Sequence, residues 1–163
     1  MRRTGKRLSM VMAWRFGAVG VDAVMEVIRD ASTFAQWMVA VPPQVRATPN
    51  WPQKGSVVQR YDGQEPRMRH AQNRHLTVAL VERWRPEDEL ALRLRSGLGG
   101  WVRVTIKVQP RPGGALIEVH SEPLTATARL RYTGTARGRA EERCAQVAER
   151  LIELATAAEP DEN

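Results

Sequence analysis

Hydrophobic and polar residues alternate along residues 9–17, which is the period of a half-buried β-strand. The apolar members of the alternation share one side, namely Met10, Met12, Trp14 and Phe16. Ser9, Ala13 and Arg15 fall on the other. Residues 21–28 then place valines and Ile28 at helical spacing, and Asp30 ends this pattern. We therefore predict a strand followed by a helix, with the row that contains Trp14 facing the interior.

Residues 31–41 carry more apolar side chains than one face of a helix needs. Phe34, Trp37 and Met38 follow one another closely, and Pro42 and Pro43 come directly after the segment. Because proline cannot continue a helix, this pattern predicts a brief second helix that ends before the two prolines.

The region from residue 43 to about 122 is almost wholly β in character. Alternating or β-branched runs occupy residues 55–61, 75–84, 90–97, 101–110 and 115–122. Turn residues separate them, at Asp62-Gly63, at 86–89, within 96–101 and at 111–114. Each run has one apolar and one polar face, with leucines or valines set against arginines. The pattern predicts consecutive antiparallel strands in a sheet with one buried face.

The segment from Arg139 onward predicts a long amphipathic helix that covers this sheet. Its apolar stripe has helical spacing and consists of Cys144, Val147, Ala148, Leu151, Leu154 and Ala155. Glu141 and Glu142 would lie in its first turn, where the helix dipole favours negative charge. Residues 123–138 remain unassigned, because Gly134 and Gly138 oppose a long continuous helix there.

This order of elements resembles the START/Bet v 1-like (SRPBCC) superfamily, in particular its bacterial polyketide cyclase/dehydrase branch. The resemblance lies in "VDAVMEVIRDASTFAQWMVAV", in "WPQKGSVV", in the turn of "RWRPEDELALRL" and in the hairpin "VTIKVQPRPGGALIEVHSE". It spans roughly residues 8–158, which we take as one domain, with a basic tail at 1–7 and a second tail at 159–163. The usual Gly-Thr after the late turn is Gly114-Ala115 here.

The resemblance implies an α+β helix-grip fold, in which a curved antiparallel sheet wraps around the C-terminal helix. A cavity lies between them, and the two short helices close one end. Under this interpretation Phe34, Trp37 or Met38 form a lid at its mouth. The full set of residues expected to line the cavity is Trp14, Phe34, Trp37, Met38, Tyr61, Leu92, Val104, Ile106, Val119, Cys144, Val147 and Leu151.

Composition and charge narrow the function classes. The chain has 163 residues, of which 42% are apolar, enough for one domain with a real core. It lacks an apolar run long enough to span a bilayer and a signal-peptide cleavage pattern, so we expect a soluble cytoplasmic protein. The net charge of +7 comes almost wholly from scattered arginines, which favours a solvated basic surface over a nucleic-acid site. The oligomeric state stays open.

Candidate chemistry in the sequence is sparse. His70, His75 and His120 have no partners at metal-ligand spacing, so we expect neither a metal nor a cofactor. The single cysteine, Cys144, lies on the apolar stripe, so we expect it to be a small buried apolar residue. Four groups could supply acid or base chemistry inside a cavity: Tyr61, Glu118, His120 and Tyr132. Glu118 and His120 would face solvent if Ile117 and Val119 face inward.

Three functions follow as hypotheses. The first is the binding of a hydrophobic small molecule, such as a lipid, polyketide or aromatic metabolite, in the cavity. The second is a polyketide cyclase, aromatase or dehydratase that acts in the same cavity, so whether the protein is an enzyme stays open. The third is a basic interaction module that presents Arg93, Arg95, Arg103 and Lys107 to an acidic partner.

Overall fold

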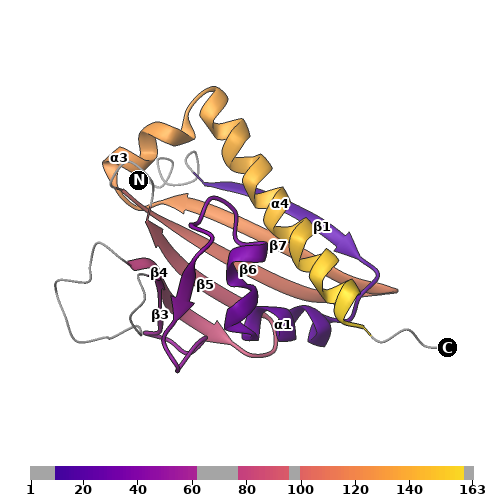
Figure 1. Cartoon of the computed structure of the whole chain (residues 1–163). Helices are drawn as coiled ribbons and strands as arrows, with labels where there is room; N and C mark the ends of the chain where they lie inside the picture. The colour runs from indigo at the N-terminus through magenta and orange to yellow at the C-terminus, as the bar shows by residue number, and fades with distance from the viewer. Residues whose placement is uncertain (1–9, 62–76, 96–99, 160–163) are drawn as a thin grey trace, which may run out of the picture.

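The computed structural model describes residues 10–61, 77–95 and 100–159 of the chain (Figure 1). In these ranges one antiparallel sheet has the strand order β1-β7-β6-β5-β4-β3-β2. Its strands are β1 (Val11–Gly17), β2 (Val45–Ala47), β3 (Val57–Arg60), β4 (Thr77–Arg85), β5 (Glu89–Arg95), β6 (Trp101–Arg111) and β7 (Gly114–Pro123). The helices are α1 (Val21–Arg29), η1 (Ala31–Thr33), α2 (Phe34–Trp37), α3 (Ala126–Arg129), η3 (Leu130–Tyr132) and α4 (Thr135–Ala158). The long helix α4 lies against one face of the curved sheet, which confirms the predicted α+β helix-grip architecture (Figure 1).

The central strands follow the predicted alternation. Leu90 and Leu92 of β5, Ile106 of β6, and Ile117 and Val119 of β7 are fully buried on the face toward α4. The hairpin between β6 and β7 turns at residues 112–113, where Gly113 adopts a φ of 83° that favours glycine. The alternating pattern predicts the buried face correctly here, because one face of these strands packs on the core and the other faces water.

Helix α4 begins four residues earlier than the sequence pattern predicts. Gly134, with a φ of 57°, precedes it, and the helix then runs through Gly138. An interior glycine costs a helix only about 1 kcal/mol, which the packing of a long helix outweighs. Glu141 and Glu142 therefore lie beyond the first turn, and that part of the prediction was wrong. The rest of the unassigned region forms α3 and η3.

The side of β1 that carries its large apolar residues was predicted to face the core. In the structure the opposite side faces the core. Met12, Trp14 and Phe16 are 46%, 56% and 49% exposed, whereas Val11 and Gly17 are buried. The reason is the close approach of α4. A Cβ at Gly17 would come within 2.8 Å of the Ile152 side chain, so α4 passes too close to this end of β1 for a large side chain to fit between them.

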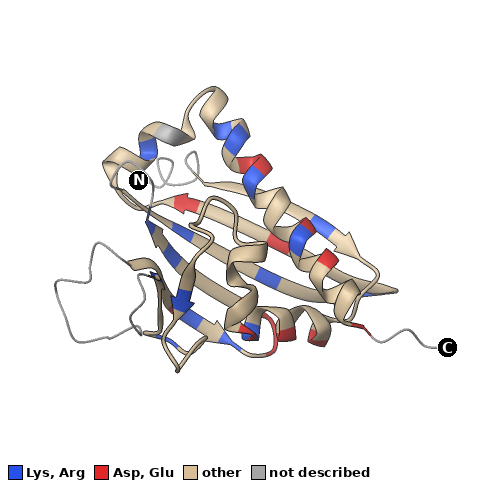
Figure 2. Ribbon diagram, viewed as in Figure 1, with Lys and Arg blue, Asp and Glu red and all other residues tan. Residues whose placement is uncertain are grey.

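The arginines of the outer sheet face are largely engaged in ion pairs. Glu82 accepts hydrogen bonds from the Nε atoms of Arg93, at 2.7 Å, and Arg103, at 2.6 Å. Arg103 also pairs with Glu122. Burial alone would raise the pKa of Glu82, but the hydrogen bonds and charges of the two arginines hold this pKa below its usual value. Basic residues are also spread over other strands and helices (Figure 2). The basic interaction module stays a prediction, and two of its four residues, Arg93 and Arg103, share the carboxylate of Glu82.

Several predictions fall outside the described residues. They are the turn at Asp62-Gly63, residues 96–99 of the predicted hairpin, His70 and His75, the tail at 1–7, and the last four residues of the chain. In the part of the chain that is described, no helix is long and apolar enough to cross a membrane.

Candidate ligand-binding cavity

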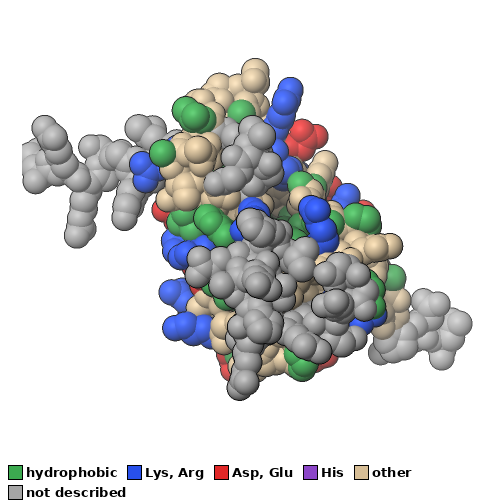
Figure 3. Space-filling model, turned by 60° about the vertical axis from the view of Figure 1, so that its left-hand side comes forward, with side chains coloured by type: hydrophobic (Ala, Val, Ile, Leu, Met, Phe, Trp, Pro, Cys, Tyr) green, Lys and Arg blue, Asp and Glu red, His purple; other side chains and the backbone are tan. Residues whose placement is uncertain are grey.

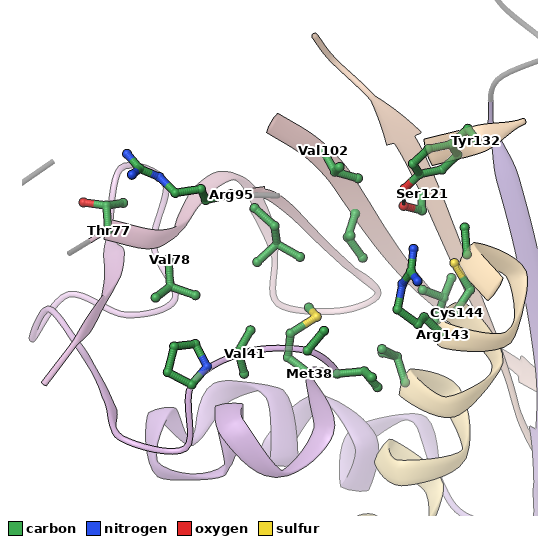
Figure 4. Close-up of a pocket in the computed structure, with 18 of the residues that line it drawn as sticks. Met38, Val41, Thr77, Val78, Arg95, Val102, Ser121, Tyr132, Arg143 and Cys144 are labelled. Atoms are coloured by element: carbon green, nitrogen blue, oxygen red, sulfur yellow. Dashed lines mark hydrogen bonds between the residues drawn. The ribbon is translucent and has the colours of Figure 1, made fainter. Parts of the chain in front are cut away.

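A cavity of about 500 Å³ lies between the sheet and α4 (Figure 4). One wall is the chain after α2, residues 38–42. The opposite wall consists of strands β4 to β7, and the N-terminal half of α4 closes the side toward η3. Ligand sites in proteins commonly have 300 to 1,000 Å³, so this space could hold a small organic molecule.

Most of the lining residues are apolar, although arginines and hydroxyls also contribute to the wall. Strands β6 and β7 contribute Val104 and Val119, and α4 contributes Ala140 and Val147. Met38 reaches in from the end of α2, and Figure 4 shows it between the strands and the helix. An apolar molecule in this space would be stabilised by about 25 cal/mol for each Å² removed from water.

A polar cluster lies where β7, η3 and α4 meet. The hydroxyls of Ser121 and Tyr132 share a hydrogen bond with an O–O distance of 2.5 Å. Arg143 of α4 lies next to them, with its guanidinium directed toward the two hydroxyls (Figure 4). These three side chains are the convergent polar groups that a mostly apolar site needs to orient a ligand.

Burial sets the ionisation of this cluster. Burial raises the pKa of the Tyr132 hydroxyl, and the hydrogen bond with Ser121 and the positive charge of Arg143 only partly oppose this. Burial likewise raises the pKa of the Cys144 thiol to about 11. Both groups therefore keep their protons at neutral pH. They can donate hydrogen bonds, but neither supplies a negative charge.

Five of the residues expected to line the cavity do line it: Met38, Val104, Val119, Cys144 and Val147. Five others are buried in the core beneath it: Phe34, Trp37, Leu92, Ile106 and Leu151. Tyr61 lies outside the lining, with the Arg46 guanidinium 3.8 Å from its ring centroid. Trp14 lies on the outer face of β1, so the expectation that it faces the cavity was wrong.

The predicted lid is built differently from the expectation. Phe34 and Trp37 make an edge-to-face contact with centroids 5.1 Å apart, and Phe34 makes a second with Trp51 at 5.6 Å. The Trp37 Nε1 donates to the Thr33 hydroxyl at 3.1 Å. Trp37 is therefore a fully buried support. The residues that follow it, from Met38 to Pro42, form the surface toward the cavity.

Sequence reasoning missed Ser121 and Arg143 and left Tyr132 as one of four acid–base candidates. Arg143 directly precedes the apolar stripe residue Cys144, so a helical wheel would have placed it at the border of the buried face. Ser121 occupies an inward position of β7, two residues after Val119. A polar residue at an inward strand position is the signal that could have identified it.

In the described ranges, no three acidic, histidine or cysteine side chains come together in a way that could hold a metal ion.

Neither a protein-family model nor a curated protein matches this chain. Solved structures do match. DynU16, of the dynemicin biosynthetic locus, superposes with a TM-score of 0.61 at 16% identity over 93% of this chain and 49% of DynU16. Ara h 8.0201 superposes with a TM-score of 0.62 at 11% identity, over 91% of this chain and 97% of that one. The fold is START/Bet v 1-like.

Protein jhp0584 from Helicobacter pylori is similar over its length as well, with a TM-score of 0.67 at 12% identity over 94% of this chain and 91% of jhp0584. This chain spans about half the length of DynU16. Identities this low establish the START/Bet v 1-like fold and leave the function to be argued from the cavity. The finer assignment to the polyketide cyclase/dehydrase branch rests on the sequence resemblance.

Proposed function

We propose that this protein binds a hydrophobic small molecule in the cavity between the sheet and α4. The observation that carries this proposal is the cavity itself, about 500 Å³ with walls made mainly of Val, Ala, Met and Pro side chains. A concave space of this size with mainly apolar lining residues and a few polar groups is the usual form of a small-molecule site.

The surroundings of the cavity support a preformed site. The buried aromatic cluster of Phe34, Trp37 and Trp51 holds the chain after α2 in place. On the opposite side Leu151 and Ile106 are fully buried, so α4 is fixed to the sheet below the cavity. A ligand would enter walls that are already ordered, and it would lose little affinity to rearrangement of the protein.

Two measurements test the proposal. Native mass spectrometry of the purified protein should detect a co-purifying small molecule. Titration with N-phenyl-1-naphthylamine, a neutral apolar dye, should give saturable binding that the substitution Ala140→Phe weakens at least about tenfold by filling the cavity. Ala157→Phe is the matched control, because Ala157 is exposed near the end of the same helix. Equal dye binding by both variants would show that the dye does not occupy the cavity and would refute the proposal.

A second candidate function is acid catalysis on the bound molecule, and Tyr132 favours it. Tyr132 lines the cavity, and its hydroxyl carries a proton at neutral pH, as an ordinary tyrosine does. A protonated hydroxyl could donate to a carbonyl oxygen of the ligand, as a cyclisation or dehydration requires. Tyr132→Phe should then abolish conversion of the co-purifying molecule while binding of the neutral dye stays within about threefold. Unchanged conversion would exclude this role.

A further inference from the structure

We infer that the cavity binds an amphipathic acid, with its anionic head at Arg143, Ser121 and Tyr132 and its apolar body along Val104 and Val119. This inference deepens the proposed function and rests on it. It assigns a chemical class to the ligand, namely one acidic group attached to a hydrophobic body.

The first step is the charge on Arg143. In the described part of the chain it forms no ion pair with a carboxylate. The neighbouring turns of α4 offer no carboxylate either. The residues three and four positions away are Arg139, Ala140, Gln146 and Val147. A half-buried guanidinium beside an apolar wall is costly to leave without a counter-charge.

The second step is that the adjacent polar groups cannot supply that counter-charge. The raised pKa values of Tyr132 and Cys144 keep both groups neutral at physiological pH. Ser121 does not ionise. Its hydroxyl and that of Tyr132 share one hydrogen bond, which leaves the proton of one hydroxyl for a further acceptor. The cluster therefore combines a positive charge with a hydrogen-bond donor, which is the pattern that recognises a carboxylate or phosphate.

The third step is the charge of the whole lining. Arg60 of β3 and Arg95 of β5 also line the cavity, and none of its described lining residues is acidic. In Figure 4 Arg95 lies on the far side of the cavity from Arg143. Figure 3 shows basic side chains along one edge of the molecule, and acidic side chains elsewhere on the same face. The resulting positive potential favours the approach of an anion.

Of the three arginines that line the cavity, we assign the anionic head group of the ligand to Arg143, because of its surroundings. Arg60 and Arg95 are exposed, so water and salt weaken their attraction for a ligand. Arg143 is half-buried and has two hydroxyls beside it. Hydrogen bonds to a charged group are stronger than neutral ones, and more so where water is partly excluded.

The test uses two dyes with the same aromatic body. 1-Anilinonaphthalene-8-sulfonate carries an acidic group that N-phenyl-1-naphthylamine lacks. Both are titrated in about 150 mM salt, which screens the exposed charges. Arg143→Gln should weaken the sulfonate dye by about tenfold to a hundredfold, the range expected for lost charged hydrogen bonds, and change the neutral dye less than threefold. Arg150→Gln, an exposed change of equal charge on the same helix, should alter neither dye. Circular dichroism and thermal unfolding confirm that each variant is folded.

The outcomes separate the two proposals. Binding of both dyes with no selective loss in Arg143→Gln would overturn the acid assignment and leave the hydrophobic site standing. Failure of both dyes to bind the native protein, with no co-purifying molecule, would overturn the hydrophobic site itself. Competition with decanoate, decyl phosphate and decanol adds an independent readout. Displacement by either acid at a concentration about tenfold below that of decanol supports the assignment, and equal displacement by decanol contradicts it.

Discussion

Replacing Trp37 and Trp14 in parallel tests whether the lid tryptophan is a structural support and the strand tryptophan a surface residue. Trp37 is fully buried, contacts Phe34 edge to face and donates a hydrogen bond to Thr33. A buried tryptophan removes about 150 to 250 Å² from water, which at 25 cal/mol per Å² corresponds to about 4 to 6 kcal/mol as an upper bound. Measured Trp→Ala changes in cores cost about 3 to 5 kcal/mol. We expect Trp37→Ala to lower the free energy of unfolding by about 4 kcal/mol.

Trp14 is the control because 56% of it is exposed. Less than half of the Trp14 surface is buried, and solvent fills the space that truncation leaves. We therefore expect Trp14→Ala to lower the free energy of unfolding by about 1 to 2 kcal/mol. Urea unfolding followed by far-ultraviolet circular dichroism measures both values. With a slope near 2 kcal/mol per M, Trp37→Ala should lower the midpoint by about 2 M and Trp14→Ala by less than 1 M. Equal losses, or a larger loss at Trp14, would refute the assigned faces of β1 and α2.

Three further changes test local packing and ionisation. Because its arginine partners hold the pKa of Glu82 below the usual value, Glu82 stabilises the fold above about pH 4.5, and this contribution is lost as pH falls through the lowered pKa. Unfolding of Glu82→Gln should therefore depend less on pH in the acid range, and identical pH profiles would contradict this. The pKa of Cys144, about 11, predicts alkylation at pH 8 roughly a hundredfold slower than in the urea-unfolded chain, and stability that falls as pH rises from about 9 to 11. Gly17→Ala should destabilise the protein by about 1 to 3 kcal/mol through a clash with Ile152, whereas Gly138→Ala, which meets open space, should stabilise it by about 1 kcal/mol. Thermal unfolding that ranks the two glycine variants in the reverse order would be incompatible with the packing of α4 on β1.

The candidate site was only partly predictable. Val104 and Val119 were expected to face inward, and they do, because a strand with one wet face imposes a period of two. Whether an inward side chain lines a void or touches the helix depends on how far α4 stands from the sheet at that level. Ile106 and Val104 lie two residues apart on one strand, yet Ile106 is in the packed core and Val104 at the cavity. No local pattern distinguishes them.

The sequence by itself determined the period of β5, β6 and β7 and the apolar stripe of α4, because backbone geometry fixes which side chains share a face. Only the tertiary structure decided which face of β1 is covered. Alternation shows that the two faces differ, but α4 approaches β1 closely at Gly17, so the side that carries Gly17 is covered and Trp14 lies on the outer side. The tertiary structure also brought Arg143 to Ser121 and Tyr132, which come from three separate elements. The proximity of these residues depends on long-range packing, so it cannot be predicted from their order along the chain.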